Sequence, residues 1–281
     1  MSVTIPQKRA AFRALHRQGC FVIPNPWDIG SARLLEGMGF KALASTSSGF
    51  AWSQGLADNG VARAAVLEHL RAMAAATDLP LNADFEGGFA DDPAGVAESV
   101  RMAVATGVAG LSIEDSTGDR ERPLRDVDDA VARIRAARVA IDETGGDTLL
   151  VGRAENFIVG RPDLEDTLKR LRAYADAGAD CLYAPGIRTR DQIMAVIAAV
   201  APKPVNLLIG FGSDLSVADV AALGVRRISV GGALARAAWS GFLHAARGIA
   251  EQGRFDAFAD AASGADLNAF FTGASRTIVG R

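Results

Sequence analysis

Short apolar runs recur along the whole chain, and between them lie longer stretches in which apolar residues repeat with the spacing of an α-helix. Short runs rich in Val, Ile, Leu and Ala are typical of buried strands, whereas longer amphipathic stretches are typical of helices that cover a sheet. The pattern predicts strands at 20–24, 42–45, 79–84, 110–114, 148–153, 180–184, 204–208 and 227–230. It predicts helices at 6–18, 29–38, 61–77, 93–106, 126–143, 163–177, 190–200, 216–223 and 233–251.

The regular alternation of strands and helices favours an α/β fold, namely a closed (β/α)8 TIM-type barrel with its helices outside. No linker rich in Pro, Gly or Ser divides residues 1–281, so we expect a single domain. Residues 1–19 are expected to hold a helix that caps the bottom of the barrel, and residues 233–281 a C-terminal helical segment. An open doubly wound sheet is the alternative, because a sequence pattern does not reveal whether a sheet closes.

Composition and charge indicate which kinds of molecule the protein does not bind. The chain has 281 residues, is 49% hydrophobic, and carries 30 basic and 33 acidic residues for a net charge of −3. It lacks a basic stripe suited to nucleic acid, an apolar run long enough to span a bilayer, and the apolar core of a signal peptide. We therefore expect a cytoplasmic protein that binds neither nucleic acid nor membrane. Cys20 and Cys181 adjoin apolar runs, which indicates core packing rather than a disulfide.

Polar side chains cluster where the predicted strands end. Parallel barrels carry their chemistry at the C-terminal ends of the strands, and the opposite ends in this chain offer mostly Gly, Lys and Pro. A functional site is therefore expected at the C-terminal ends. The residues there are Asn25, Asp28, Ser45, Thr46, Ser47, Ser48, Asp84, Glu86, Glu114, Asp115, Arg153 and Glu155, and Asn206 lies within the seventh strand.

The acids after the third and fourth strands indicate a divalent metal. Asp84, Glu86 and Glu114 offer only oxygen ligands, which favours Mg²⁺, or Mn²⁺, over zinc. Magnesium keeps several waters, so one direct carboxylate and two that act through water are sufficient. The alternative is a buried ion network in which Asp84 and Glu86 pair with Arg153 and Arg120.

Two common catalytic arrangements are disfavoured by where the basic residues fall. His16, His69 and His244 all lie in predicted helices and are expected to face away from the strand ends, which argues against a Ser-His-Asp triad or a His-ligated zinc. No lysine lies inside a predicted strand, which argues against a Schiff-base aldolase.

The run Thr46-Ser47-Ser48-Gly49 after the second strand offers hydroxyls and successive backbone amides, which suit an anion. An ordinary turn is the alternative for such a run. Arg153 adds a planar cation able to grip a carboxylate through two hydrogen bonds. Together these residues favour a small dianionic substrate that chelates a metal.

Five segments in order along the chain carry a resemblance to a known family. They are Asn25-Pro-Trp-Asp28; Thr46-Ser47-Ser48 leading to Gly55-Leu-Ala-Asp58; Asp84-Phe-Glu86-Gly-Gly-Phe89; Gly110-Leu-Ser-Ile-Glu114-Asp115; and Arg153-Ala-Glu155. Over about residues 10 to 250 the chain resembles the isocitrate lyase/phosphoenolpyruvate mutase superfamily. The resemblance implies a (β/α)8 barrel, a last helix swapped between subunits, and a homo-oligomer built as a dimer of dimers. It also implies Mg²⁺, a 2-oxo or 2-hydroxy carboxylate substrate, and cleavage of a C–C or P–C bond beside an enolate.

The resemblance also implies roles for individual residues. Asp84 would bind Mg²⁺ most directly, with Asp58, Glu86 and Glu114 supporting it through waters. The substrate carboxylate would be held by the amides of Ser47 and Ser48 and the hydroxyl of Thr46. Arg153 would contact the carboxylate or enolate oxygen, and Trp27 would line the pocket floor, where a core role is equally open. We take Arg153, Glu114 and Asp58 as catalytic candidates and Asn206 as a further substrate-binding candidate.

Departures from the family pattern bear on the reaction. The lyases carry a Lys-Lys/Arg-Cys-Gly-His segment after the fourth strand, whereas residues 116–125 here contain neither Cys nor His. The lysine- and asparagine-bearing lid of the mutases and phosphonopyruvate hydrolases is also missing, and Glu86 stands where an aspartate is usual. Arg120, Arg122 and Arg125 form either a different lid that attracts a dianion or a solvated charged loop. Oxaloacetate decarboxylation is favoured, because loss of CO₂ needs no acid for the leaving group.

Other functions stay open. Within the superfamily they are a (methyl)isocitrate lyase with another acid, and P–C chemistry on phosphonopyruvate. A phosphosugar-type barrel is suggested by Gly210-Phe-Gly212 and Gly231-Gly232 after the last two strands, where many barrels hold phosphate. A 2-oxo acid-binding protein without turnover is the non-enzymatic alternative.

Overall fold

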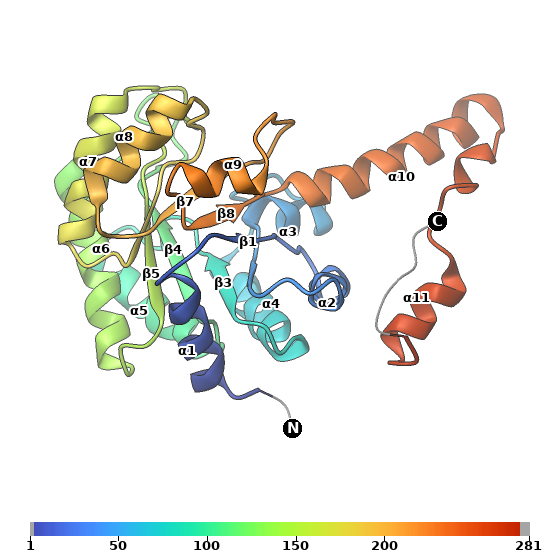
Figure 1. The fold of residues 1–281 in the computed structure, drawn as a ribbon, viewed down its shortest axis with the longest axis horizontal. Helices are drawn as coiled ribbons and strands as arrows, with labels where there is room; N and C mark the ends of the chain where they lie inside the picture. Colours follow the sequence, from blue (N-terminus) through green and yellow to red (C-terminus); the bar gives the residue numbers. More distant parts are fainter. Residues whose placement is uncertain (1–2, 276–281) are drawn as a thin grey trace.

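The computed structural model describes residues 3–275 and contains one sheet of eight parallel strands (Figure 1). Every strand falls inside one of the apolar runs predicted from the sequence. The strands are β1 (Phe21–Ile23), β2 (Leu43–Ala44), β3 (Leu81–Asp84), β4 (Gly110–Glu114), β5 (Leu149–Arg153), β6 (Cys181–Tyr183), β7 (Val205–Leu208) and β8 (Arg227–Ser229).

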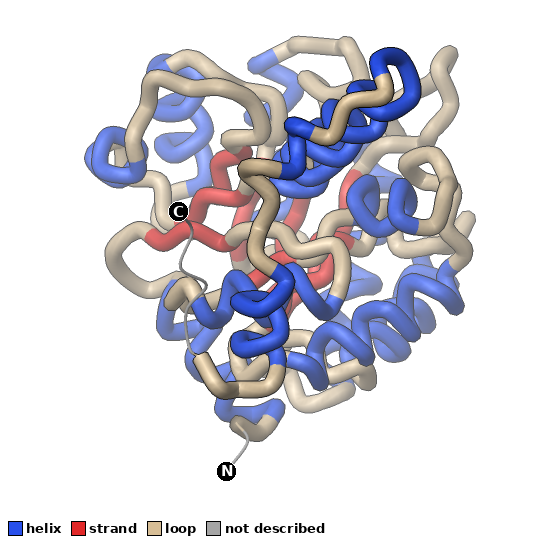
Figure 2. Tube along the Cα trace, turned by 90° about the vertical axis from the view of Figure 1, so that its right-hand side faces the viewer, coloured by secondary structure: helices blue, strands red, loops and turns tan. Residues whose placement is uncertain are grey.

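The sheet closes into a barrel. Hydrogen-bonded neighbours run β1-β8-β7-β6-β5-β4-β3-β2, so closure requires β2 to meet β1. They meet where the Ala44 amide donates to the Pro24 carbonyl at 3.0 Å, and the Asn25 Nδ2 donates across the same seam to the Ser45 carbonyl at 2.9 Å. Figure 2 shows the strands gathered at the centre with helices around them. The predicted (β/α)8 barrel is confirmed, and the open sheet is excluded.

Helices follow the strands and cover the outside of the barrel. Most match the predicted ranges; α3 was not predicted, and η1 and α11 lie in the segment 233–281 that was expected to be helical without separate ranges. Helix α3 begins in the Ser/Thr/Gly run that was predicted to bind an anion or to form a turn, because Thr46 acts as its N-cap and accepts a hydrogen bond from the Gly49 amide at 3.3 Å. The helices are α1 (Ile5–Leu15), α2 (Ile29–Gly37), α3 (Ser47–Ser53), α4 (Arg63–Ala76), α5 (Pro93–Val104), α6 (Val127–Glu143), α7 (Leu164–Asp176), α8 (Arg190–Val200), α9 (Val217–Ala222), α10 (Ala233–Gln252), η1 (Asp256–Phe258) and α11 (Gly264–Phe271).

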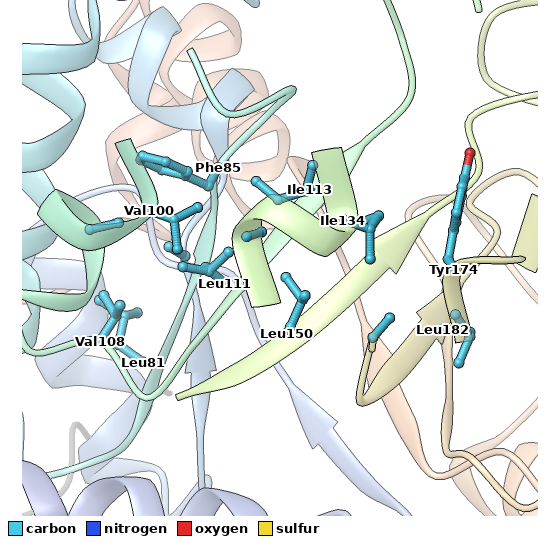
Figure 3. Close-up of a cluster of buried hydrophobic side chains, with 14 of the residues drawn as sticks. Leu81, Phe85, Val100, Val108, Leu111, Ile113, Ile134, Leu150, Tyr174 and Leu182 are labelled. Carbon is cyan, nitrogen blue, oxygen red and sulfur yellow. The ribbon is translucent and has the colours of Figure 1, made fainter. Parts of the chain in front are cut away.

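The main core lies between the barrel and its helices. Leu111 and Ile113 of β4 are buried there with Ile134 of α6 (Figure 3). Because side chains alternate along a strand, Ser112 and Glu114 of the same strand face the barrel interior. The alternation therefore decides which residues of β4 stabilise the fold and which can take part in a site.

Helix α1 closes the N-terminal end of the barrel. Phe12 is fully buried with inward-facing residues of the strands, and a Cβ on Gly110 would lie 2.7 Å from its ring. Lys8 Nζ donates to the Ala74 carbonyl at 2.8 Å, and Arg9 Nη2 donates to the Val104 carbonyl at 2.8 Å, so α1 also caps the ends of α4 and α5. The open end of the barrel is therefore the C-terminal end.

The last helices depart from the barrel pattern. Helix α10 projects away from the barrel in Figure 1 and buries only Ala235 among its residues. Helix α11 contacts α2, where Arg33 Nη2 donates to the Phe271 carbonyl at 3.2 Å. Cys181 is buried and Cys20 half-buried, and both thiols are free, as predicted. Within residues 3–275 no helix has the length and apolar character that crossing a bilayer demands.

Candidate active site

Arg153, the last residue of β5, lies at the centre of an acidic cluster. Its Nη1 is 2.6 Å from Asp84 Oδ1, and its Nη2 is 3.1 Å from Glu114 Oε2. Its Nε is 2.9 Å from Glu155 Oε1, and the guanidinium carbon lies 5.0 Å from the centroid of the Tyr183 ring. Glu114, Arg153 and Tyr183 are paired positions on β4, β5 and β6, so strand register brings them together.

The charges in this cluster depend on one another. Burial raises the pKa of Glu114 and of Glu155, and Arg153 opposes the rise in both. Burial alone would lower the pKa of Arg153, but Glu155, Glu114 and Asp84 outweigh it and raise that pKa. Each of the three guanidinium nitrogens of Arg153 already has a carboxylate partner. The pairing of Asp84 with Arg153 matches one half of the predicted ion-network alternative.

The loop after β3 holds Glu86 in an uncommon backbone conformation. The φ angle is 47° at Glu86 and 53° at Phe89, in the left-handed region that non-glycine residues seldom adopt. The loop is anchored on both sides of Glu86, since Phe85 is fully buried and Arg133 of α6 donates to the Ala90 carbonyl at 2.9 Å. Backbone strain held in place by the surrounding structure is common at functional positions.

Glu86 differs electrostatically from Asp84. Neither Glu86 nor Arg120 forms an ion pair within the described part of the chain, so the other half of the ion-network alternative is absent. Burial raises the pKa of Glu86 to about 8, and the neighbouring Asp84, Glu114 and Asp58 add to the rise. Carboxylates that repel one another beside a cavity are suited to a cation.

The start of α3 is turned toward Asp84. The Ser47 amide and Ser47 Oγ both donate to Asp84 Oδ2, at 2.9 and 2.8 Å. Thr46 Oγ1 lies 3.1 Å from Ser48 Oγ as well as capping the helix. The Ser47 amide, which was predicted to hold a substrate carboxylate, therefore orients Asp84 in this structure.

A cavity of about 360 Å³ opens at the C-terminal ends of the strands. Trp52 lines it and Trp27 does not; Trp27 is half-buried beside Gly49. Asp58, exposed in the loop before α4, lines the same cavity. Among the predicted residues the cavity wall brings together Thr46, Ser47, Ser48, Asp58, Asp84 and Arg153.

Sequence reasoning missed Arg227 on β8. Its side chain lines the cavity although only 2% of the residue is exposed. Asn206, which was predicted to bind substrate, is fully buried instead and accepts a hydrogen bond from Arg227 Nε at 2.8 Å. A charged residue beside apolar neighbours inside a predicted strand is the sequence signal that identifies such a position.

His69 of α4 lies closer to the site than predicted. It lines a small recess beside Asp84 and Glu86, and its ring stacks on Phe50 with centroids 3.8 Å apart. Burial lowers the pKa of His69 to about 4, so the ring is neutral at ordinary pH.

The loop of residues 116–125 folds as a short hairpin. Ser116 and Leu124 form an isolated antiparallel bridge, and Arg125 pairs with Asp129 of α6 at 3.2 Å. Arg120 is exposed and lines a second cavity of about 430 Å³ that also reaches Glu114. Of the three arginines proposed as a lid, Arg120 lines a cavity that reaches Glu114, Arg153 and Glu155 of the acidic cluster.

The backbone amides after β8 are already engaged. Asn25 Oδ1 accepts hydrogen bonds from the amides of Val230 and Gly231, both at 2.9 Å. A phosphate at this position would compete with the Asn25 side chain that joins β1 to β8. One of the two glycine segments that suggested the phosphosugar alternative, Gly231-Gly232, therefore has its first amide already engaged.

The donor set fits a hydrated magnesium ion better than a protein-only cage. In the region from residue 3 to residue 275, no three His, Cys, Asp or Glu side chains are grouped so as to hold a metal directly. Asp84 is partly exposed to the cavity, and the carboxylates around it repel one another. Magnesium in proteins often binds one or two carboxylates and completes its shell with water.

Residues 12–250 match the family model for phosphoenolpyruvate phosphomutase. The chain belongs to this family. Its relatives include lyases and mutases, so the predicted superfamily is confirmed and the chain is a member of an enzyme superfamily whose structures include a Mg²⁺ complex.

Among curated relatives, an uncharacterized protein of Mycobacterium tuberculosis is 32% identical over 86% of this chain and 89% of its own length. An oxaloacetate decarboxylase of Paraburkholderia xenovorans is 30% identical over 79% of this chain and 74% of its own.

Two solved structures extend the comparison. A protein of Burkholderia cenocepacia J2315, provisionally assigned as a lyase/mutase, is 48% identical and covers 97% of this chain and 99% of its own, with a TM-score of 0.94. Phosphonopyruvate hydrolase in complex with oxalate and Mg²⁺ is 26% identical, covers 98% of this chain and 96% of its own, and has a TM-score of 0.83.

Proposed function

We propose that this chain is a Mg²⁺-dependent carbon–carbon lyase that acts on a small 2-oxo or 2-hydroxy dicarboxylate through an enolate, with oxaloacetate decarboxylation as the favoured reaction. The observation that carries the proposal is the acidic cluster around Arg153 at the ends of β3, β4 and β5. The similarity to an oxaloacetate decarboxylase supports the choice of reaction.

In this proposal Asp84 holds the metal directly, and Asp58, Glu86 and Glu114 hold it through waters. Mg²⁺ is preferred and Mn²⁺ is an alternative, because every donor is a hard oxygen. When bound, the ion would supply positive charge beside the oxygen on which negative charge develops. The structural similarity to a hydrolase that binds oxalate and Mg²⁺ supports this choice.

The chain's own residues then have distinct tasks. Arg153 orients the carboxylates of Asp84 and Glu114 and presents a permanent cation to the substrate. The hydroxyls of Thr46 and Ser48, on the cavity wall, are proposed to hold the substrate carboxylate. Trp27 remains a predicted contact, although Trp52 is better situated because it lines the cavity.

The loop of residues 116–125 favours decarboxylation over aldol-type cleavage. Cleavage that releases glyoxylate requires proton transfers to and from the departing fragments, and this loop offers no Cys or His for them. In decarboxylation the C–C bond breaks, CO₂ leaves without a proton, and the remaining enolate takes its proton at C3, from water if no side chain supplies it. This difference is why oxaloacetate ranks above isocitrate and methylisocitrate.

An activity screen tests the proposal. The purified protein is assayed with Mg²⁺ against oxaloacetate, isocitrate, methylisocitrate and phosphonopyruvate, with pyruvate, glyoxylate and phosphate as readouts. Because free Mg²⁺ also decarboxylates oxaloacetate in solution, a sample of Asp84→Asn at equal metal concentration is the baseline. Pyruvate release above this baseline, lost in excess chelator, is expected. Glyoxylate from isocitrate at an ordinary enzymatic rate would contradict the argument from the loop.

The oligomer is proposed on the exposed apolar surface of α10. Trp239, Phe242 and Leu243 on this helix are 38%, 60% and 43% exposed. We propose that α10 packs on a second copy of the chain, as the resemblance to swapped-helix relatives implies, within a dimer of dimers. Light scattering of the purified protein is expected to give a mass above that of one chain, and Phe242→Asp is expected to lower it.

A further inference from the structure

Arg227 is a buried arginine without an acidic partner. It lies on β8 with 2% of its surface exposed, and its Nε donates to Asn206 Oδ1 at 2.8 Å. Its Nη1 lies 3.3 Å from Asn82 Oδ1 on β3, so the side chain crosses the barrel interior. Across residues 3–275 no carboxylate lies within ion-pair distance of this guanidinium.

The groups around Arg227 are neutral or positive. Burial lowers the pKa of Arg227, whereas the nearby Cys181 and Tyr183 act to raise it. Burial raises the pKa of Cys181 to about 11 and that of Tyr183 to about 12, so both are protonated at neutral pH. The charged group that acts on Arg227 is Arg153, which carries the same positive charge and also lowers the pKa of Arg227. A buried cation without a counter-ion is costly in free energy, and a bound anion removes that cost.

The hydrogen bonds to Arg227 orient it without neutralising it. Asn206 Nδ2 donates to Ser229 Oγ at 2.9 Å, and Asn82 Nδ2 donates to the Ala83 carbonyl at 3.0 Å. With their amide nitrogens engaged, both asparagines turn an oxygen toward Arg227. The hydrogen bonds found for Arg227 within the described chain use its Nε and Nη1, so other N–H donors of the guanidinium remain for a ligand. Arg227 also lines the cavity from which a ligand would approach.

Arg227 and the acidic cluster share one cavity. The wall that carries Asp84 and Arg153 also carries Arg227, Asn82 and Ser112, and its volume of about 360 Å³ suits a small ligand. Ser112 and Ala44 are small inward-facing residues on this wall and leave space inside the barrel. A ligand held at Asp84 by one end can therefore extend toward the barrel interior.

We propose that Arg227 binds the second carboxylate of the dicarboxylate substrate inside the barrel and so makes the enzyme selective for dicarboxylates over monocarboxylates. Arg227 is then a specificity-determining residue, and Asn206 and Asn82 are positioning residues that act through it. The inference rests on the proposed function, because it takes the metal end of the substrate to lie at Asp84. It assigns the second carboxylate to the barrel interior instead of to Arg120 in the 116–125 hairpin.

A matched pair of unreactive ligands tests the inference. 3,3-Difluorooxaloacetate and 3,3-difluoropyruvate share the 2-oxo acid end and differ in the second carboxylate. Their dissociation constants with Mg²⁺ are measured by calorimetry for the wild-type protein, Arg227→Met and Arg227→Lys, with oxalate as a probe of the metal end alone. Arg236→Met is the control, because Arg236 lines the mouth of the same cavity and stacks on Phe211 at 4.6 Å.

The wild-type protein is expected to prefer the dicarboxylate by about tenfold to a hundredfold, as a charge-assisted hydrogen-bond pair provides. The preference is expected to disappear in Arg227→Met, to fall partly in Arg227→Lys, and to persist in Arg236→Met, with oxalate affinity within about threefold of wild type throughout. If the Arg227 variants do not fold, the wild-type and Arg236→Met proteins still test the inference, because equal affinities for the two ligands in the wild type, or loss of the preference in Arg236→Met, contradict it.

Other outcomes separate the two proposals. If oxalate binds with Mg²⁺ but the preference survives in Arg227→Met and vanishes in Arg236→Met, the second carboxylate lies at the cavity mouth and the inference is wrong. If Arg227→Met loses stability but keeps the preference, Arg227 is structural only. If oxalate shows no Mg²⁺-dependent binding, the proposed function fails, whatever the Arg227 variants do.

Discussion

Two arginines line the same cavity in opposite surroundings. Arg153 pairs with three carboxylates, those of Asp84, Glu114 and Glu155, whereas the hydrogen bonds found for Arg227 within the described chain go to the amide oxygens of Asn206 and Asn82. Arg153 stabilises the fold itself, because its charge offsets the repulsion among these three carboxylates. Arg227 has unused donors. The comparison teaches that a buried arginine indicates a ligand most strongly when the protein does not already neutralise it.

The largest expected effect is the loss of activity when the charge of Asp84 in the acidic cluster is removed. Asp84→Asn keeps an acceptor for Ser47 but removes the charge that would hold the metal, so decarboxylation above the solution background is expected to fall by about a thousandfold or more. Circular dichroism is expected to be unchanged. Asp176→Asn, an exposed acid on α7, is the control and is expected to keep wild-type activity. Substantial Mg²⁺-dependent turnover by Asp84→Asn would show that the metal lies elsewhere.

The two arginines are expected to differ in their contribution to stability. Arg153→Met leaves three buried or half-buried carboxylates without a counter-charge and is expected to lower the free energy of unfolding by about 3–5 kcal/mol. Arg227→Met loses two hydrogen bonds but also removes an uncompensated buried charge, so a loss under about 2 kcal/mol is expected. Urea unfolding without metal measures both. Equal losses would remove the distinction between the two sites.

The positive field around Arg227 extends to His16 at the bottom of the barrel. Burial, and next the charge of Arg227, lower the pKa of His16 to about 3. The unfolded chain, with a histidine pKa near 6.5, therefore binds more protons than the folded chain between about pH 6.5 and 3, and stability falls as the pH falls through this window. The loss from His16 is up to about 1.4 kcal/mol per pH unit.

Replacing Arg227 is expected to weaken this pH dependence. In Arg227→Met the pKa of His16 is expected to rise toward its ordinary value, because one of the charges that lower it is gone. Titration of the His16 ring by NMR in both proteins measures the change directly. An unchanged pKa would show that the charge of Arg227 does not act on His16.

The smallest expected effect concerns Glu86. Burial, and next the charges of Asp84, Glu114 and Asp58, raise its pKa, so Glu86→Gln is expected to stabilise the metal-free protein by about 1 kcal/mol. The same change is expected to weaken Mg²⁺ binding by about tenfold, since a supporting charge is lost. Thermal unfolding with and without Mg²⁺ measures both effects. Destabilisation without metal would indicate that Glu86 holds the loop rather than the ion.

Much of the architecture was predictable because strand and helix periods are local properties of a sequence. The barrel strands fall inside the predicted apolar runs, and Asp84, Glu114 and Arg153 meet because the ends of parallel strands meet. Helix α3 was missed because the Thr46 cap resembles an ordinary polar turn until its helical hydrogen bonds are seen.

The sequence does not show which inward-facing residues of different strands lie at the same height in the barrel. Arg227 and Arg153 are both arginines in strands, and their different partners depend on the closure and stagger of the barrel. Asn206 was predicted to bind substrate; in this structure its side chain hydrogen-bonds to Arg227 and Ser229, which no sequence spacing connects to it. His69 turned toward the site for the same reason, since the face of α4 that packs inward is decided by tertiary contacts.

A crystal structure of the protein with Mg²⁺ and 3,3-difluorooxaloacetate tests the central claim most directly. The account predicts a metal beside Asp84, the 2-oxo acid end of the ligand at that metal, and the C4 carboxylate hydrogen-bonded to Arg227 inside the barrel. A C4 carboxylate directed outward to Arg120 or Arg236, or a ligand bound without a metal near Asp84, would contradict it.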